Sequence, residues 1–93
     1  MSYYIYITTN PAKSVLYIGI TNDLKSRLGQ HYANRGDNQT FAGRYFCYNL
    51  LYFEEYPDSQ SAIAREKELK GWTRVKKEAL IAASNLEWTF LEL

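Results

Sequence analysis

The stretch YYIYITTNPAKSVLYIGI, residues 3–20, decides the fold. Residues 3–8 and 15–20 are rich in aromatic and β-branched side chains, which favour extended strands. Between them, Asn10 and Pro11 interrupt the pattern, because both residue types favour turns and proline has no backbone N–H to donate. Two such runs joined by a short connection predict an antiparallel β-hairpin.

Side chains of the two predicted strands separate onto two faces, because successive strand residues point in opposite directions. One face is apolar and is expected to be core; it holds Ile5, Ile7, Leu16, Ile18 and Ile20. The other face holds Tyr4, Tyr6, Val15, Tyr17 and Gly19. Neighbouring phenols beside a glycine indicate either an aromatic patch covered by a helix or a functional site with open space.

After the hairpin, the sequence predicts a helix, a loop and a third strand. The helix covers residues 21–33, and Thr21 or Asn22 is expected to cap it. Residues 34–44 are polar and contain glycine, which predicts a loop. Residues 45–56 are apolar and aromatic, which predicts a strand.

Two further helices are expected in the carboxyl half of the chain. Residues 58–72 begin with an aspartate and a serine, either of which caps a helix, and Gly71 lies at the carboxyl end. Residues 73–84 form the next predicted helix, with Thr73 as its cap. The apolar tail, residues 85–93, is expected to fold back onto the body of the protein.

The order β-β-α-β-α-α predicts an α+β fold, a small antiparallel sheet with helices. With 93 residues and no linker or repeat, residues 1–93 are expected to form a single domain. The chain is 46% hydrophobic and 23% charged, a balance typical of soluble globular proteins. The single cysteine, Cys47, fits a reducing cytoplasm, and no signal peptide or membrane span is recognised, so we expect a cytoplasmic protein without a membrane partner.

The net charge of +1, from eleven Lys and Arg against ten Asp and Glu, excludes strong attraction to a polyanion through total charge. Any nucleic-acid contact must therefore come from local placement. Basic side chains crowd one short region, which contains Lys67, Lys70, Arg74, Lys76 and Lys77. We expect a positive rim there, in which Lys70 and Arg74 bind nucleic acid; the alternative is an ordinary solvated helix surface. One cysteine and one histidine exclude the usual zinc-ligand spacing.

The first predicted helix turns two polar residues toward its apolar side. With about 100° between successive residues, Arg27 and His31 fall on one arc with Leu24 and Leu28. Arg27 and His31 are four residues apart, so they stack on the same face. A single inward histidine is usually a hydrogen-bonded core residue, but an arginine beside it favours a cavity that both side chains share.

Glu66 lies in the middle of the apolar arc of the second predicted helix. The rest of that arc consists of Ala62, Ile63 and Leu69. The solvent side is expected to hold Arg65, Lys67 and Glu68. A carboxylate on a buried face is costly unless it is paired, hydrogen-bonded or bound to a metal. Glu66 is therefore either half of a structural ion pair with Arg27 or His31, or a functional residue.

The tripeptides YIY, residues 4–6, and YIG, residues 17–19, followed by Arg27, His31 and Glu66, resemble the GIY-YIG nuclease superfamily. The resemblance continues through AREKELKGW and LEWTFLEL and is strongest to the small stand-alone branch. It implies a three-stranded antiparallel sheet flanked by helices, and a metal-dependent endonuclease that hydrolyses phosphodiester bonds in DNA. The implied cofactor is one divalent ion, Mg²⁺ or Mn²⁺, which suits carboxylate and phosphate oxygens.

The resemblance also assigns roles to individual positions. The implied catalytic residues are Tyr6, Tyr17, Arg27, His31 and Glu66. Glu66 is the implied metal ligand, and Gly19 is the implied structural residue of the site. Tyr4 stands where the family's first tripeptide has glycine, and its side chain is expected to narrow the groove.

The group that activates water is one of two tyrosines. A phenol is a weak base at neutral pH, so Tyr6 or Tyr17 needs help from the metal, from Arg27 or from His31. A hydrogen bond from Tyr6 to His31 would carry its proton onward, which favours Tyr6. Arg27 is expected to hold a phosphate oxygen through its guanidinium fork.

Three functions are consistent with this pattern: an endonuclease, a nucleic-acid-binding module with the nuclease fold but little or no turnover, and a scaffold whose polar cluster is an internal hydrogen-bond network. The presence of all five polar positions favours the enzyme, because a drifted binding module is expected to lose Glu66 first. The sequence leaves open whether the nucleic acid is duplex, branched, single-stranded or RNA, and how many chains assemble.

Overall fold

The predicted hairpin is present in the computed structural model, which describes residues 1–93. Strand β1, Tyr3–Thr9, pairs antiparallel with strand β2, Leu16–Thr21. Asn10 holds the turn between them, because its side-chain oxygen accepts hydrogen bonds from the backbone N–H groups of residues 14 and 15. The turn residue recognised in the sequence therefore organises the connection through its own side chain.

Strand β3, Asn49–Tyr56, pairs antiparallel with the other side of β1, so the sheet order is β2-β1-β3. The predicted α+β class with a three-stranded antiparallel sheet is confirmed. The strand begins later than residue 45, where the sequence predicted it. Phe46 has a φ of 58°, a left-handed conformation that an extended strand excludes. β1 is the central strand, and β2 and β3 form the edges.

Helix α1, Leu24–Ala33, begins later than predicted. Its cap is Asp23, whose carboxylate accepts a hydrogen bond from the backbone N–H of Ser26. The prediction of Thr21 or Asn22 as the cap is wrong. The Thr21 hydroxyl accepts a hydrogen bond from the backbone N–H of Asp23 instead, which holds the connection just before the helix.

The segment predicted as a loop contains a short helix, α2, Phe41–Arg44. Thr40 caps it by accepting a hydrogen bond of 3.0 Å from the backbone N–H of Gly43. The backbone N–H of Cys47 donates to the carbonyl of Ala42 at 2.9 Å and ties the helix to the following chain. One helical turn has no apolar periodicity, so sequence patterns did not distinguish it from a polar loop.

Helices α3, Ser59–Lys70, and α4, Arg74–Ser84, have the predicted positions and are confirmed. Asp58 caps α3, Gly71 lies at its carboxyl end, and Thr73 caps α4. None of the helices has both the length and the apolar character that crossing a membrane requires.

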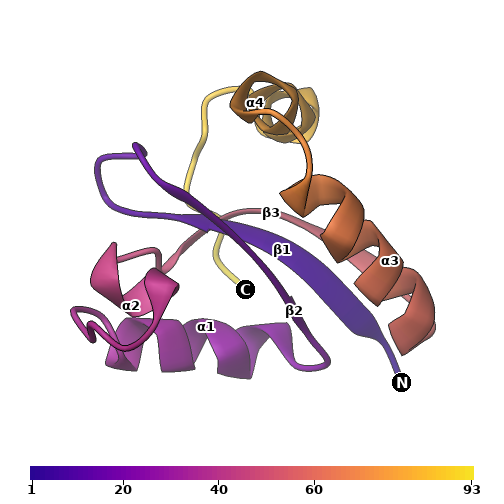
Figure 1. Cartoon of the computed structure of the whole chain (residues 1–93), viewed down its shortest axis with the longest axis horizontal. Coiled ribbons are helices and arrows are strands. Elements are labelled where there is room, and N and C mark those ends of the chain that lie inside the picture. Colours follow the sequence, from indigo (N-terminus) through magenta and orange to yellow (C-terminus); the bar gives the residue numbers. More distant parts are fainter.

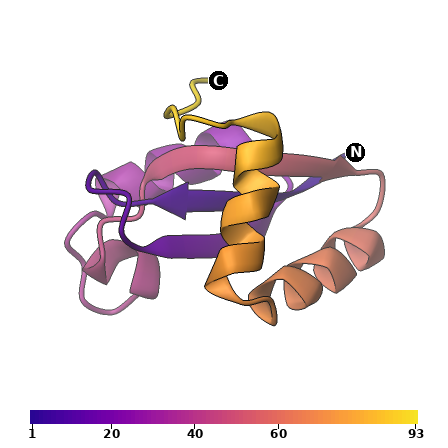
Figure 2. The same ribbon diagram turned by 90° about the horizontal axis from the view of Figure 1, so that it is seen from above.

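The helices lie on two sides of the sheet (Figure 1). α3 and α4 cover one face, and from above α4 crosses the strands while α3 lies toward the β2 edge (Figure 2). The larger core lies between these two helices and the sheet; its buried members are Ile5, Ile7, Ile18, Leu51, Ala62, Leu69 and Ile81. α1 covers the opposite face, where a smaller buried cluster contains Tyr6, Leu24 and Leu50. The predicted division of the hairpin into two faces is confirmed.

The carboxyl-terminal tail folds back along β3, as predicted. The backbone N–H of Leu91 donates to the carbonyl of Leu50 at 2.8 Å. The side-chain amide of Asn85 donates to the carbonyl of Leu51 at 3.0 Å and also binds the backbone of Thr89. These contacts satisfy outer-edge carbonyls of β3 that would otherwise be open to another strand.

The predicted faces of α3 need one correction. Ile63, expected in the apolar arc, is 40% exposed, and Arg65, expected in solvent, is half-buried. Arg65 turns toward the sheet because its Nε and Nη2 donate to the carboxylate of Glu54 on β3, at 2.9 and 3.0 Å. The hydroxyls of Tyr52 and Tyr56 donate to the same carboxylate. The guanidinium of Arg65, held by a fixed carboxylate partner, therefore lies on the inward face, and Ile63 does not.

Candidate active site

A buried tyrosine and histidine form the base of the site. Tyr6 lies on central strand β1, and His31 lies in the last turn of α1. The Tyr6 hydroxyl and His31 Nε2 are hydrogen-bonded at 2.7 Å, and both side chains are buried. Their ring centroids are 5.7 Å apart. This contact fixes the end of α1 against the sheet.

Tyr17 extends this pair toward solvent. It lies on edge strand β2, and its ring meets the His31 ring edge-on, with centroids 5.3 Å apart. The centroids of Tyr17 and Tyr6 are 6.2 Å apart. Tyr17 is half-buried, whereas Tyr6 is completely covered. Of the two phenols, Tyr17 is thus the one that faces a cavity.

Gly19 leaves the space that the Tyr6 ring occupies. The two residues are opposite each other in the β1–β2 pairing. A Cβ atom at position 19 would lie 2.5 Å from the Tyr6 Cζ and would also overlap its hydroxyl oxygen. Any larger side chain would displace the ring, so the position requires glycine for close approach rather than for backbone freedom.

Arg27 lies one helical turn before His31, and its guanidinium Nη1 donates to the side chain of Gln30 at 2.8 Å. The cavity that it lines has a volume of about 140 Å³. The lining residues are Tyr17, Arg27, His31, Asn34, Thr40, Phe41 and Ala42. No acidic side chain is among them, so the one charge at the cavity wall is positive.

Burial sets the protonation states of the Tyr6–His31 pair. Burial raises the pKa of Tyr6 to about 12. Burial, and then the nearby charge of Arg27, lowers the pKa of His31 to about 4. At neutral pH the phenol is therefore protonated and the imidazole is uncharged. Arg27 carries the positive charge of the site.

Glu66 lies on α3, the helix that covers the other face of the sheet. Its side chain is only 17% exposed, and its ion-pair partner is Lys70, at 3.4 Å. The predicted structural alternative, an ion pair of Glu66 with Arg27 or His31, is absent. Of the five predicted catalytic residues, the structure therefore brings four together, Tyr6, Tyr17, Arg27 and His31. Glu66 lies on the other face of the sheet, on α3, which packs along the edge strand that carries Tyr17.

Comparison with known proteins identifies the family. Residues 2–79 match the family model of the GIY-YIG catalytic domain. The chain belongs to the GIY-YIG family. The resemblance recognised from the two tripeptides and the polar positions that follow them is confirmed.

Individual relatives of this GIY-YIG chain are UPF0213 proteins. One from Bacillus pumilus is 35% identical over 86 residues, which cover 92% of this chain and 85% of the relative. One from Haloquadratum walsbyi is 37% identical over 78 residues, covering 84% of each chain. The solution NMR structure of a UPF0213 protein from Bacillus halodurans has a TM-score of 0.58 and 28% identity, covering 95% of this chain and 90% of that chain.

GIY-YIG nucleases generally use a divalent metal, and this chain offers few side chains that could bind one. No group of three or more His, Cys, Asp and Glu side chains is placed to hold a metal ion. Glu66 is a half-buried carboxylate whose charge is countered by the exposed Lys70. Mg²⁺ accepts one or two carboxylates together with water and phosphate oxygens, so a single Glu66 fits this requirement. Glu54 does not, because Arg65 and two tyrosines already occupy its oxygens.

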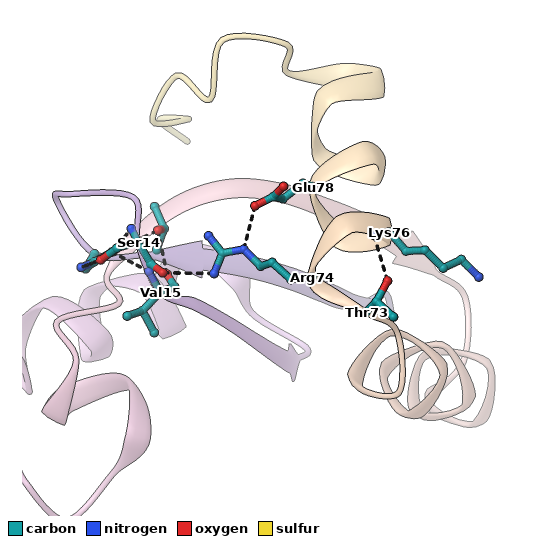
Figure 3. Close-up of polar contacts among 8 residues, drawn as sticks. Ser14, Val15, Thr73, Arg74, Lys76 and Glu78 are labelled. Atoms are coloured by element: carbon teal, nitrogen blue, oxygen red, sulfur yellow. Dashed lines mark hydrogen bonds and ion pairs between the residues drawn. The ribbon is translucent and has the colours of Figure 1, made fainter.

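The two cations predicted to bind nucleic acid have partners within the chain. Figure 3 shows Arg74 reaching from α4 toward the β1–β2 turn. Its Nη1 donates to the carbonyl of Ser14 at 3.1 Å, and its Nε pairs with Glu78 at 2.9 Å. Lys70 is exposed and pairs with Glu66. Their nucleic-acid role stays a prediction, and Arg74 also fastens α4 to the hairpin.

The sequence did not single out Phe41 and Thr40, which line the cavity from α2 and its cap. The Phe41 ring stacks on the Tyr17 ring, with centroids 6.2 Å apart and an angle of 25° between the planes. Thr40, a residue type that favours the N-cap position, was the available signal, but it lies within a polar stretch.

Proposed function

We propose that this GIY-YIG domain, formed by residues 1–93, is an endonuclease that hydrolyses phosphodiester bonds in DNA. The observation that carries the proposal is the cavity in which a half-buried Tyr17 adjoins Arg27, with a buried Tyr6–His31 pair behind them. The cavity joins a phenol that can hold a water molecule to a guanidinium that can hold a phosphate.

Tyr17 is the phenol that faces the attacking water. Sequence reasoning favoured Tyr6, but a completely buried hydroxyl bonded to His31 cannot reach a substrate without breaking that contact. Tyr17 lines the cavity and needs no such rearrangement. Its hydroxyl oxygen accepts a hydrogen bond from the water and orients it for attack on phosphorus, and the proton that the water loses passes to solvent.

Arg27 holds the phosphate. Its guanidinium presents several N–H groups in a fixed fork, which matches two phosphate oxygens. Gln30 engages one of these groups and orients the fork. Negative charge increases on the phosphate oxygens during attack, so a positive group fixed beside them stabilises the transition state.

Tyr6 and His31 position the other groups. The neutral imidazole packs edge-on against the Tyr17 ring. Its hydrogen bond with Tyr6 on β1 holds α1, which carries Arg27, against the sheet. Glu66 would hold Mg²⁺ or Mn²⁺ beside the same edge strand. When bound, the ion supplies positive charge for the phosphate and for the leaving oxygen.

A second candidate is a nucleic-acid-binding module with the nuclease fold and little or no turnover. The observation in its favour is that Glu66 lies on α3 and does not line the Tyr17 cavity. A net charge of +1 gives weak general affinity for DNA, so such a module would depend on local contacts.

The test is nicking of supercoiled plasmid with Mg²⁺ by the wild type and by Tyr17→Phe, Tyr6→Phe and Glu66→Ala, all purified identically. We expect Tyr17→Phe and Glu66→Ala to lose about 100-fold or more in rate. Tyr48→Phe, on a ring that packs against Tyr32 and does not line the cavity, is the matched control and should cut like the wild type. Equal nicking by all variants would reveal a contaminating nuclease. Nicking lost in Tyr6→Phe but kept in Tyr17→Phe would overturn the assignment.

A further inference from the structure

A pair of aromatic rings extends from the active-site cavity to the surface. Phe41 stacks on Tyr17, and the ring centroids of Phe41 and Tyr45 are 4.8 Å apart. Phe41 is 51% exposed and Tyr45 is 42% exposed. Both rings come from α2 and its C-cap, which lie beside the carboxyl end of α1 (Figure 1).

These rings are not what holds α2 in place. The buried residues of the helix are Ala42 and Gly43, and a Cβ atom at Gly43 would lie 2.5 Å from the carbonyl oxygen of Asp37. The cap hydrogen bond from Gly43 to Thr40 and the bond from Cys47 to Ala42 complete the attachment. A helix anchored by small residues has no structural need for two exposed rings, whose apolar surface remains in contact with water.

The same two rings line a second cavity, of about 280 Å³. Its lining residues are Asn38, Gln39, Thr40, Phe41, Arg44 and Tyr45. Thr40 and Phe41 also line the Tyr17 cavity, so the two cavities meet at Phe41. No acidic side chain lines either cavity. Arg44 donates one N–H to the carbonyl of Asn38, at 3.4 Å, and its other N–H groups remain for a ligand.

We propose that Phe41 and Tyr45, with Arg44, form a binding site for an unstacked nucleobase of the DNA strand whose phosphate lies at Arg27. A flat aromatic face binds the flat face of a base, and it does so for a base that has left its stack in the duplex. Arg44 contributes a cation beside the backbone of the same strand. This site rests on the proposed endonuclease function and specifies its substrate as DNA with an unpaired segment at the cleavage position.

The test separates binding from cleavage by measuring affinity in EDTA. A fluorescently labelled single-stranded oligonucleotide and a blunt duplex of the same sequence are titrated with the wild type, the Phe41→Ala/Tyr45→Ala variant and the Phe41→Leu variant. We expect the wild type to bind the single strand more tightly. Loss of a stacking ring should weaken that binding about tenfold or more, with little change for the duplex. Phe41→Leu keeps apolar bulk without a flat face and should lose affinity as well.

Phe90→Ala is the matched control. Phe90 is a comparably exposed ring on the tail, lies under Lys13 and lines neither of the two cavities, so its removal should leave oligonucleotide affinity unchanged. Thermal melts of each variant establish that it is folded. If Phe41→Ala/Tyr45→Ala does not fold, Phe41→Trp supplies the measurement, because a base stacked on the new indole should quench its fluorescence.

The possible outcomes distinguish this site from the proposed function. Single-strand binding that depends on the rings, without cleavage of any DNA, would support the site and contradict the endonuclease. Cleavage with affinities that do not depend on the rings would overturn the site and leave the endonuclease standing. Ring variants that change the sedimentation of the protein but not its oligonucleotide affinity would show a protein contact instead, and would also overturn it.

Discussion

The hydroxyl of Tyr6 and Nε2 of His31 lie 2.7 Å apart, with both side chains buried between α1 and the sheet. Tyr6 belongs to the central strand and His31 to the last turn of α1, so this contact joins two elements that are distant in sequence. It also forms the rear of the cavity that Tyr17 and Arg27 line. Stability and the proposed function are therefore expected to be coupled at this hydrogen bond.

The first prediction concerns the cost of removing that bond. Tyr6→Phe keeps the ring and leaves His31 Nε2 buried without a partner, so the free energy of unfolding should fall by about 1–3 kcal/mol. Urea denaturation at pH 7 measures it. Tyr4→Phe, on a neighbouring ring that packs against Phe53, should change stability far less. Equal losses of unfolding free energy in the two variants would show that the Tyr6–His31 hydrogen bond does not itself stabilise the fold.

The second prediction concerns pH. Burial lowers the pKa of His31 to about 4, below its ordinary value of 6.5. Between these two values the unfolded chain binds more protons than the folded chain, so this contribution is complete above pH 6.5 and is lost as pH falls toward 4. From pH 7 to pH 5 the wild type should lose about 2 kcal/mol through His31. His31→Gln cannot titrate, so its loss over that window should be smaller by this amount. If the free energy of unfolding fell equally with pH in the wild type and in His31→Gln, a buried neutral His31 would be contradicted.

The third prediction concerns Gly19. Gly19→Ala forces a methyl group against the Tyr6 ring, which should destabilise the fold by about 1–3 kcal/mol and misplace Tyr6. Adding Tyr6→Phe should not rescue it, because the ring carbon Cζ is also only 2.5 Å from the new Cβ. Gly29→Ala is the control: it meets no atom within 4 Å on α1 and should stabilise by up to about 1 kcal/mol. Thermal melts compare the set, and a tolerated Gly19→Ala would refute the close approach.

The fourth prediction concerns the partner that turns Arg65 inward. Arg65→Met leaves the half-buried Glu54 without its cation and should cost about 1–3 kcal/mol, less than for a fully buried pair. Combining it with Glu54→Gln removes the unpaired carboxylate charge and should recover part of the lost stability. A double variant that is as unstable as the sum of the two singles would argue against a coupled pair.

The sequence was most informative where a short period repeats. Alternation along the hairpin predicted both of its faces, because neighbouring strand residues must point in opposite directions. It did not predict how deeply each side chain lies, so Tyr6 and Tyr17 looked equivalent although one is completely covered. Depth depends on α1, whose His31 closes over Tyr6 and only meets the edge of Tyr17.

The sequence was least informative where a partner comes from a distant segment. Arg65 was placed in solvent by helical periodicity alone, but its position is set by Glu54 on β3. Helix α2 was read as a loop because four residues contain no repeat. Phe41 therefore went unrecognised, although it lines the cavity beside Tyr17.

The central claim is that the cavity between Tyr17 and Arg27, together with Glu66 on α3 at the other face of the sheet, hydrolyses phosphodiester bonds. In the proposed function Glu66 contributes to catalysis and little to stability, since its ion pair is an i,i+4 contact with the exposed Lys70, worth about 0.3–0.5 kcal/mol. Glu66→Gln keeps the shape of the side chain and removes its charge. Its metal-free stability should therefore stay close to that of the wild type.

The most direct measurement is the single-turnover rate of phosphodiester cleavage by the wild type and by Glu66→Gln, with and without Mg²⁺, together with melts of both proteins in EDTA. We predict metal-dependent cleavage by the wild type, a loss of about 100-fold or more in Glu66→Gln, and matching melts. Wild-type cleavage rates in a folded Glu66→Gln protein would contradict the account, as would a large loss of melting temperature in EDTA.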